Sequence, residues 1–193
     1  KGKRIGVTTA GSLTDWLTRK LADSKGWGPQ GIDIVPMGEM RTRLAAMKSG
    51  ELVGSVNSIQ ETWNLVEQGQ GRLLATFAEA VPDFHTHVIF AHRNLVEKNP
   101  ELVRRFLRGW FKTAHYMRDN RADTVKFIAG VMKISEKVID ESYDYELKML
   151  SMVGAFNPKA IETIRYSLKD LGVLDRIPEA KELFMPGFAP VKL

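Results

Sequence analysis

Residues 4–21, RIGVTTAGSLTDWLTRKL, decide the fold of this chain. Residues 4–8 form a short apolar and β-branched run of the kind that makes a buried strand. The small residues from Thr9 to Ser12 then favour a turn. Ser12 has Asp15 three positions later, which is the spacing of a capping box at the start of a helix. The stretch therefore predicts a strand, a turn and an amphipathic helix in direct succession.

The same alternation of strands and helices continues as far as residue 92. Further strands are predicted at residues 32–35, 52–56, 73–77 and 87–90, and further helices at residues 40–47 and 59–66. Short strands that alternate with helices at this spacing are typical of a mostly parallel sheet with helices on both faces. Residues 1–92 are therefore predicted to form one α/β lobe.

Residues 93–193 differ from the first part because they form an almost continuous series of helical patterns. Asn99 suits a helix cap, and Pro100 suits the first helical turn. The helix that follows has an apolar stripe, in which Trp110 and Phe111 are expected to be core residues. Its basic residues, expected to be solvated, are Arg104, Arg105, Arg108, Lys112 and Arg118. Further helices are predicted at residues 123–132, 136–152 and 158–171, so the C-terminal part is expected to be largely helical.

The composition excludes several classes of protein. No cysteine is present, which rules out disulfides, thiolate metal sites and cysteine nucleophiles. No apolar run approaches the roughly 20 residues that span a bilayer. The net charge of +5 suits an anionic ligand or an acidic neighbouring surface, but it is too modest to indicate nucleic-acid binding. A globular protein without a nucleic-acid partner is therefore expected.

Three loops of the predicted sheet share one design, in which a strand is followed by small or polar residues and then by a helix. They are residues 8–12, 37–40 and 57–61. Such loops surround the ligand crevice of an open parallel sheet, and helix N-termini present N–H groups that suit a carboxylate, sulfonate or phosphate. The opposite interpretation is that Ser12 and Ser58 only cap their helices. Acidic residues in two first turns partly neutralise the helix ends, so a zwitterion or neutral polar solute stays open.

The candidate ligand-binding residues lie in these loops and just before the last predicted strand. They are Thr9, Gly11, Ser12, Gly38, Asn57, Ser58, Phe84 and His85. His85 and His87 would share one face of a strand, as two metal ligands do, but no third ligand accompanies them, so a polar rim is preferred. No nucleophile elbow, phosphate-binding loop or zinc motif occurs. The sequence therefore predicts binding without catalysis, metal or cofactor.

Four stretches of the chain follow the pattern of one family. They are residues 1–12 (KGKRIGVTTAGS), 44–51 (LAAMKSGE), 82–84 (PDF) and 99–107 (NPELVRRFL). They resemble the substrate-binding proteins of ABC importers, in particular the NMT1/THI5-like group for sulfonates, nitrate and thiamine precursors. The resemblance implies a periplasmic-binding-protein type II fold. It also implies a periplasmic or other extracytoplasmic protein that captures a small polar or anionic solute by lobe closure and delivers it to a membrane permease.

Two departures from the family pattern leave the solute open. Residues 52–54 are Leu-Val-Gly where the family usually has Val-Asp-Ala, and residues 58–60 are Ser-Ile-Gln where a Pro-rich turn is common. Sulfonate, carboxylate, nitrate and pyrimidine solutes therefore all remain candidates. Two other functions also remain. One is a ligand-sensing lobe of a regulatory protein. The other is a thiamine-pyrimidine-synthase-like enzyme, although that branch has a cysteine-rich iron site and this chain has no cysteine.

The resemblance also implies that the chain starts at the second lobe and lacks the N-terminal part of the first. Because it begins at Lys1 without a signal segment, a processed or cut product is expected. The helices after Asn99 would then lack the sheet that they normally cover. Their apolar stripes are expected to be buried against residues 1–92, another copy or a missing segment. The sequence therefore predicts self-association through apolar helix faces or binding of an N-terminal fragment.

Overall fold

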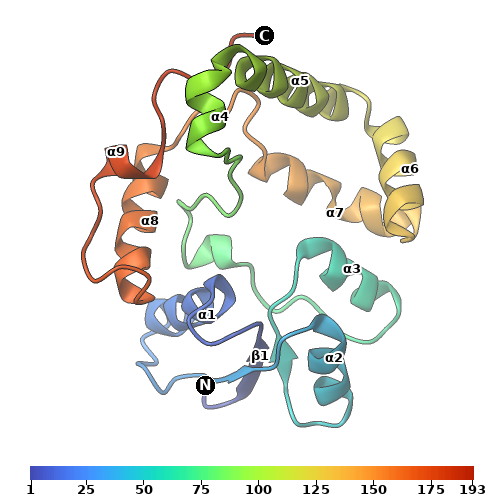
Figure 1. Ribbon diagram of the computed structural model, residues 1–193. Helices are drawn as coiled ribbons and strands as arrows, with labels where there is room; N and C mark the ends of the chain where they lie inside the picture. Colours follow the sequence, from blue (N-terminus) through green and yellow to red (C-terminus); the bar gives the residue numbers. More distant parts are fainter. The chain divides into compact units, whose positions relative to one another are not determined.

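The computed structural model describes residues 1–193, and Figure 1 shows its helices and strands. The sheet has three parallel strands, β1 (Arg4–Val7), β2 (Asp33–Pro36) and β3 (Gly54–Ser55), in the order β2-β1-β3. The central strand β1 pairs with both neighbours, so that Gly6 lies opposite Val35 on one side and Ser55 on the other. The parallel sheet and its alternation with helices confirm the predicted α/β fold class.

Two predicted strands do not form. Residues 73–77 and 87–90 make no backbone ladder, and Phe77–Glu79 forms a short 3-10 helix, η1. Leu74 does lie beside β3, because its Cδ1 is 4.0 Å from the position that a Cβ on Gly54 would occupy. A short apolar run fits a pleated surface, but a strand also needs a neighbour with which its N–H and C=O groups pair. Both predictions are therefore wrong.

Residues 1–58, 73–84 and 159–180 form the first of two compact units. It contains the sheet, α1 (Leu13–Ser24), α2 (Met40–Lys48), η1 and nearly all of α8 (Pro158–Asp170). Val7 of β1 and Leu52, just before β3, are buried in its core. Helix α8 is joined to α1 through Asp170, whose Oδ2 lies 3.0 Å from Lys20 Nζ and accepts the Trp16 indole N–H at 3.4 Å. Helices far apart in the sequence thus share one unit.

Residues 59–72, 85–158 and 181–193 form the second unit, which is helical. Its helices are α3 (Ile59–Glu67), α4 (Arg93–Lys98), α5 (Pro100–Asp119), α6 (Arg121–Met132), α7 (Glu136–Met149) and nearly all of the short α9 (Ala180–Leu183). The core between α6 and α7 consists of Val125, Ala129, Ile139 and Tyr143. Helix α3 packs on α7, where the ring centroids of Trp63 and Tyr145 are 6.1 Å apart. The largely helical character predicted for the C-terminal half is confirmed.

Helix α5 has a wider apolar stripe than its neighbours cover. Its buried residues are Leu107, Phe111 and Ala114. Trp110 is 49% exposed, so its assignment to the core is wrong. Successive helical positions are about 100° apart, and Trp110 faces away from the neighbours that bury Phe111. Arg104 is not simply solvated, because it donates to Gly187 O at 2.6 Å and its guanidinium lies 4.6 Å from the centroid of the Phe188 ring.

Both units are assembled from segments that are far apart in the sequence. The first unit takes residues 159–180 from the C-terminal half, and the second takes residues 59–72 from the N-terminal half. The division into domains at residues 1–92 and 93–193 stays a prediction, which separate expression of the two parts would test. No helix of the structure combines the length and the apolar character that crossing a bilayer requires.

Candidate functional site

Three hydroxyl groups gather at the carboxyl end of β1, just before and within the first turn of α1. The Thr8 hydroxyl donates to Ser12 Oγ at 3.0 Å. Thr14 Oγ1 lies 2.8 Å from Thr8 Oγ1 and 2.9 Å from Ser12 Oγ. The Thr8 N–H also donates to Thr14 Oγ1 at 3.1 Å. Because a hydroxyl can donate as well as accept, this hydroxyl cluster offers short, adaptable contacts to a polar head group.

The start of α1 is held by a modified capping arrangement. Ser12 Oγ accepts the Asp15 N–H at 3.4 Å, as the capping box predicts. The buried Asp15 carboxylate, however, accepts the N–H of Gly11 at 2.8 Å rather than that of Ser12, and it pairs with Arg19 at 2.7 Å. The Gly11 N–H is therefore occupied within the chain. The first two N–H groups of the helix have no internal partner, so they are free to meet a ligand.

The loop after β2 is tied to the hydroxyl cluster through its backbone. Gly38 has a φ of +68°, in the left-handed region that favours glycine. Its N–H donates to Thr8 O at 2.7 Å. A Cβ added to Gly38 would meet nothing within 4 Å, so the loop is open on that side. Gly38 thus contributes turn geometry and open space, while its own N–H is already used.

Arg43 of α2 joins the loop after β2 to the loop after β3. Its Nη1 donates to Gly38 O, and its Nη2 donates to Val56 O at 3.3 Å and to Asn57 Oδ1 at 3.4 Å. Asn57 Nδ2 in turn donates to Ser55 Oγ at 2.9 Å, which orients the side-chain amide. The guanidinium therefore fixes the backbone that carries two of the predicted ligand residues.

Six of the predicted ligand residues lie in the loops that follow the three strands. They are Thr9, Gly11, Ser12, Gly38, Asn57 and Ser58. Parallel strands end at one edge of a sheet, which is why loops separated by some fifty residues meet there. Thr9 is exposed, and Ser58 directly precedes α3. The predicted loops are therefore brought together, whereas the contact of each residue with a ligand stays a prediction.

Two further residues of this edge, Thr14 and Arg43, were missed by the sequence analysis, and Thr8 lies in a predicted loop but was not named as a ligand residue. A signal for Arg43 does exist, because it lies three positions after Met40 and four before Met47 on the apolar side of its helix. A cation at a core position of an amphipathic helix indicates a buried polar contact. The partners of Arg43 lie in another loop, so no local pattern could identify them.

Phe84 and His85, the last two predicted ligand residues, belong to different units. Phe84 packs on Trp16 of α1 in the first unit, with ring centroids 5.4 Å apart. His85, in the second unit, accepts the Asn157 N–H on Nε2 at 3.0 Å and meets the Phe156 ring edge-on. No group of three His, Asp or Glu side chains is placed to hold a metal ion. Both residues have partners within the chain, and their role toward a ligand stays a prediction.

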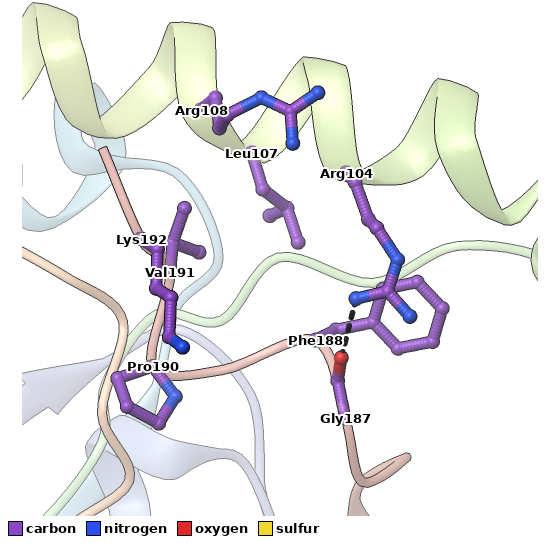
Figure 2. Close-up of a pocket in the computed structure, with 8 residues that line it drawn as sticks. All are labelled: Arg104, Leu107, Arg108, Gly187, Phe188, Pro190, Val191 and Lys192. Atoms are coloured by element: carbon purple, nitrogen blue, oxygen red, sulfur yellow. Dashed lines mark hydrogen bonds between the residues drawn. The ribbon is translucent and has the colours of Figure 1, made fainter.

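A cavity of about 340 Å³ lies in the second unit, between α5 and residues 187–192 (Figure 2). Its lining residues are Arg104, Leu107, Arg108, Gly187, Phe188, Pro190, Val191 and Lys192. Figure 2 shows Arg104 reaching from α5 to the Gly187 carbonyl beside the Phe188 ring. A second cavity of similar volume is lined by Arg93 and residues 181–186. Neither cavity contains a predicted ligand residue.

Glu146 of α7 has an altered acidity. Burial raises the pKa of this carboxyl, while the charge of His87 and a hydrogen bond with Gln60 act in the opposite direction. A raised carboxyl pKa often marks an acid or base in catalysis. Glu146 lines neither of the two cavities, so partial burial between packed helices is a sufficient explanation.

The parallel sheet, with polar loops at its carboxyl edge, has the fold of a periplasmic-binding-protein lobe. A solved structure with a similar fold is the alkanesulfonate-binding protein SsuA from Xanthomonas axonopodis pv. citri bound to MOPS. The match has a TM-score of 0.67 and 16% sequence identity, and it covers 93% of this chain and 60% of that chain. The present chain therefore spans 60% of the length of that protein.

The family follows from the sequence comparison. The model of the family described as NMT1/THI5 like matches residues 1–124, which is more than half of the chain. The chain belongs to the NMT1/THI5-like family, which confirms the resemblance found in its motifs. No curated protein sequence gives a significant match.

Proposed function

We propose that the chain is the solute-binding component of an ABC importer and captures a small polar or anionic organic solute. The observation that supports this best is the carboxyl edge of the sheet, where the hydroxyl cluster, the open N–H groups of α1 and the loops held by Arg43 are joined by hydrogen bonds. Family membership agrees with this function. The similar structure of a protein described as alkanesulfonate-binding also supports it.

The proposed binding mode uses groups of three kinds, which are backbone N–H groups, polar loop residues and aromatic rings. The N–H groups of Leu13 and Thr14, at the positive end of α1, would donate hydrogen bonds to the anionic oxygens of the solute. Polar contacts would come from Thr9, Ser12, Asn57 and Ser58, close approach of the solute to the backbone would occur at Gly11 and Gly38, and ring contacts would come from Phe84 and His85. The solute would be a sulfonate, carboxylate, nitrate or pyrimidine compound. We infer that lobe closure around the solute completes the site, as in hinge-bending binding proteins.

The partner and location follow from the same proposal. A solute-binding component delivers its ligand to the membrane permease of the importer, so the chain would work in the periplasm or another extracytoplasmic space. Such a protein binds its solute and releases it without chemical change. Incubation with the bound solute, followed by NMR of the solution, should therefore recover the solute unaltered. A converted product would instead support the enzyme branch of the family.

The central test is a thermal-shift series with the folded chain. The probes are ethanesulfonate, propionate, nitrate and a hydroxymethylpyrimidine, each over a range of concentrations. A ligand that binds only the folded state stabilises it by about 2.7 kcal/mol at 100 times its Kd. One class of probe should therefore raise the Tm by several degrees. The absence of a shift with every probe, for a chain that circular dichroism shows to be folded, would contradict solute capture.

A matched pair of variants tests the site. Thr9→Ala removes an exposed hydroxyl of the loop after β1, whereas Thr42→Ala removes an exposed hydroxyl on α2. The loss of one hydrogen bond should weaken binding of the active probe about fivefold in Thr9→Ala. Thr42→Ala should bind as the unmodified chain does. Equal affinities for all three proteins would remove Thr9 from the proposed site.

A further inference from the structure

Arg43 is buried, although arginine is among the residues least often buried in proteins. Only 4% of its surface is exposed. The stem of its side chain lies over the central strand, where its Cδ is 3.1 Å from the position that a Cβ on Gly6 would take. A side chain at position 6 would thus displace Arg43. The absence of a Cβ on Gly6 therefore makes room for the buried arginine.

The charge of Arg43 has no acidic partner. All of its internal hydrogen bonds go to neutral oxygens, namely the carbonyl groups of Gly38 and Val56 and the side-chain amide of Asn57. Its Nε is buried without any partner. A buried cation normally has a carboxylate beside it, because removal from water otherwise disfavours the charged form. The guanidinium is therefore an uncompensated positive charge at the carboxyl edge of the sheet.

Asp15 and Glu39, in the first turn of α1 and at the start of α2, do not neutralise this charge. Asp15 is already paired with Arg19 at 2.7 Å and holds the Gly11 N–H. Glu39, at the start of α2, is exposed and makes no capping hydrogen bond, so water and salt screen its charge. The charge of Arg43 therefore adds to the positive helix end of α1.

Arg43 also connects the three loops into one hydrogen-bonded chain. Gly38 donates its N–H to Thr8 O at 2.7 Å, which joins the loops after β1 and β2. Arg43 then joins Gly38 to Val56 and Asn57 after β3. A guanidinium has a rigid planar fork, so it fixes the separation of the oxygens that it bridges. Movement of Arg43 would therefore displace two ligand loops together.

We propose that Arg43 is the residue that selects the charge of the solute, and that it does so in two ways. Its uncompensated charge favours an organic anion over an uncharged molecule of the same shape, because charges interact strongly away from bulk water. Its fork holds the loops after β2 and β3 at the separation that binding requires. This inference rests on the proposed function, since it concerns the same site. Arg43 itself acts from behind the loops as a positioning residue.

The test compares a charged probe with an uncharged one of nearly equal shape. Ethanesulfonate and ethanesulfonamide are titrated by calorimetry into the unmodified chain, Arg43→Gln, Arg43→Lys and Arg41→Gln. Arg41 is an exposed arginine of the same helix and serves as the control. The unmodified chain and Arg41→Gln should prefer the sulfonate by about tenfold or more. Arg43→Gln should reduce this preference to about twofold or less.

Arg43→Lys separates the effect of the positive charge from the effect of the planar guanidinium. Lysine keeps the positive charge but has no planar fork, so both probes should bind several-fold more weakly while the sulfonate preference persists. A purely structural role would weaken both probes equally in Arg43→Gln and leave the preference unchanged, and that result would overturn the proposal. If Arg43→Gln does not fold, Arg43→Lys still tests the proposal, because a lost preference in a variant that keeps the positive charge overturns charge selection.

The outcomes also separate this inference from the proposed function. If the unmodified chain binds an uncharged pyrimidine but not ethanesulfonate, solute capture stands and charge selection by Arg43 is overturned. If it binds ethanesulfonamide as tightly as ethanesulfonate, the same conclusion holds. If none of the probes in the thermal-shift series binds, the proposed function fails, and the inference fails with it.

Discussion

At the start of α1, the Asp15 carboxylate accepts hydrogen bonds from the Gly11 N–H at 2.8 Å and from Arg19 at 2.7 and 3.2 Å. Asp15→Ala should lower the free energy of unfolding by about 1–3 kcal/mol, because the Gly11 N–H and the Arg19 guanidinium lose the acceptor that they share. Urea denaturation measures the change. Asp23→Ala, at an exposed position of the same helix, is the control and should stay within about 0.5 kcal/mol of the unmodified chain. If Asp15→Ala and Asp23→Ala change the free energy of unfolding equally, the Asp15 carboxylate does not contribute to stability.

Two glycines of similar φ separate backbone strain from steric conflict. Gly154 has a φ of +72° and Gly26 a φ of +65°. A Cβ on Gly154 would lie 2.5 Å from the Phe111 ring, whereas a Cβ on Gly26 would meet nothing within 4 Å. Gly26→Ala should therefore cost only the left-handed strain of about 1–2 kcal/mol. Gly154→Ala should cost about 1–3 kcal/mol more through overpacking.

Urea denaturation of both alanine variants checks this prediction. The difference between them is the informative quantity, because the backbone contribution is common to the two. Equal losses of stability would show that Phe111 moves away without cost. Such a result would mean that the packing of α5 against residue 154 is loose.

At the scale of elements, the contact between α1 and α8 predicts a pH dependence. The hydrogen bond from Lys20 is the main cause that lowers the pKa of Asp170, and Trp16 acts in the same direction. Because the pKa of Asp170 is lowered in the folded state, its ionised carboxylate stabilises the fold at pH values above the ordinary pKa of an aspartate. This stability is lost as the pH falls below about 4. Asp170→Asn should therefore lower stability at pH 7, by about 0.5 kcal/mol for a largely exposed pair.

The Tm of Asp170→Asn should also depend less on pH in the acidic range than that of the unmodified chain. Asp175→Asn, an exposed position in the same unit, is the matched control. It should keep the full acidic decrease in Tm. If the two variants have parallel pH profiles, the contact between Lys20 and Asp170 does not join the helices in solution.

Helices were predicted better than strands because their signals are local. Asn99 and the proline at position 100 place the start of α5 correctly, although the Asn99 side chain makes no capping hydrogen bond. The spacing of apolar residues reveals α6, α7 and α8. The strands predicted at 73–77 and 87–90 are mostly apolar, but no neighbouring strand pairs with them. Ladder formation depends on residues far away in the sequence, so composition alone cannot show it.

In the candidate site, too, features with a local sequence signal were predicted, and those that depend on distant residues were not. Strand ends and helix starts can be found locally, so the three loops at the edge of the sheet were predicted. The contacts of Arg43 with Val56 and Asn57 span more than ten residues, and they depend on the register of β3 beside β1. The use of the Gly11 N–H by Asp15 is also invisible to pattern reasoning, because a capping box predicts the neighbouring amide instead.

At the scale of the whole molecule, each compact unit combines segments that hydropathy does not connect. The first unit receives α8 from beyond residue 158, and the second receives α3 from the N-terminal half. A periodic pattern shows which face of a helix is apolar, but not which element covers it. The apolar stripe of α5 therefore indicates a candidate contact surface, since no element of its unit packs against part of it.

The exposed part of that stripe predicts self-association. Leu102, Phe106 and Trp110 follow one another at helical spacing on α5, with 47%, 55% and 49% of their surfaces exposed. The rings of Phe106 and Trp110 lie 6.2 Å apart and form a continuous apolar face. Burying such a face against a second copy removes apolar surface from water and is favourable. We expect the sedimentation coefficient of the chain to rise with concentration between the micromolar and the near-millimolar range.

Replacing both rings should abolish this rise. The double variant Phe106→Ser, Trp110→Ser removes most of the apolar face, while both positions stay tolerant of polar residues because they are exposed. The control is the double variant Tyr166→Ser, Val173→Ser, which removes exposed apolar side chains from the other unit and should still associate. If the unmodified chain sediments as a monomer at every concentration, no second copy covers α5. If both double variants associate less to the same degree, general surface hydrophobicity rather than the face of α5 drives the assembly.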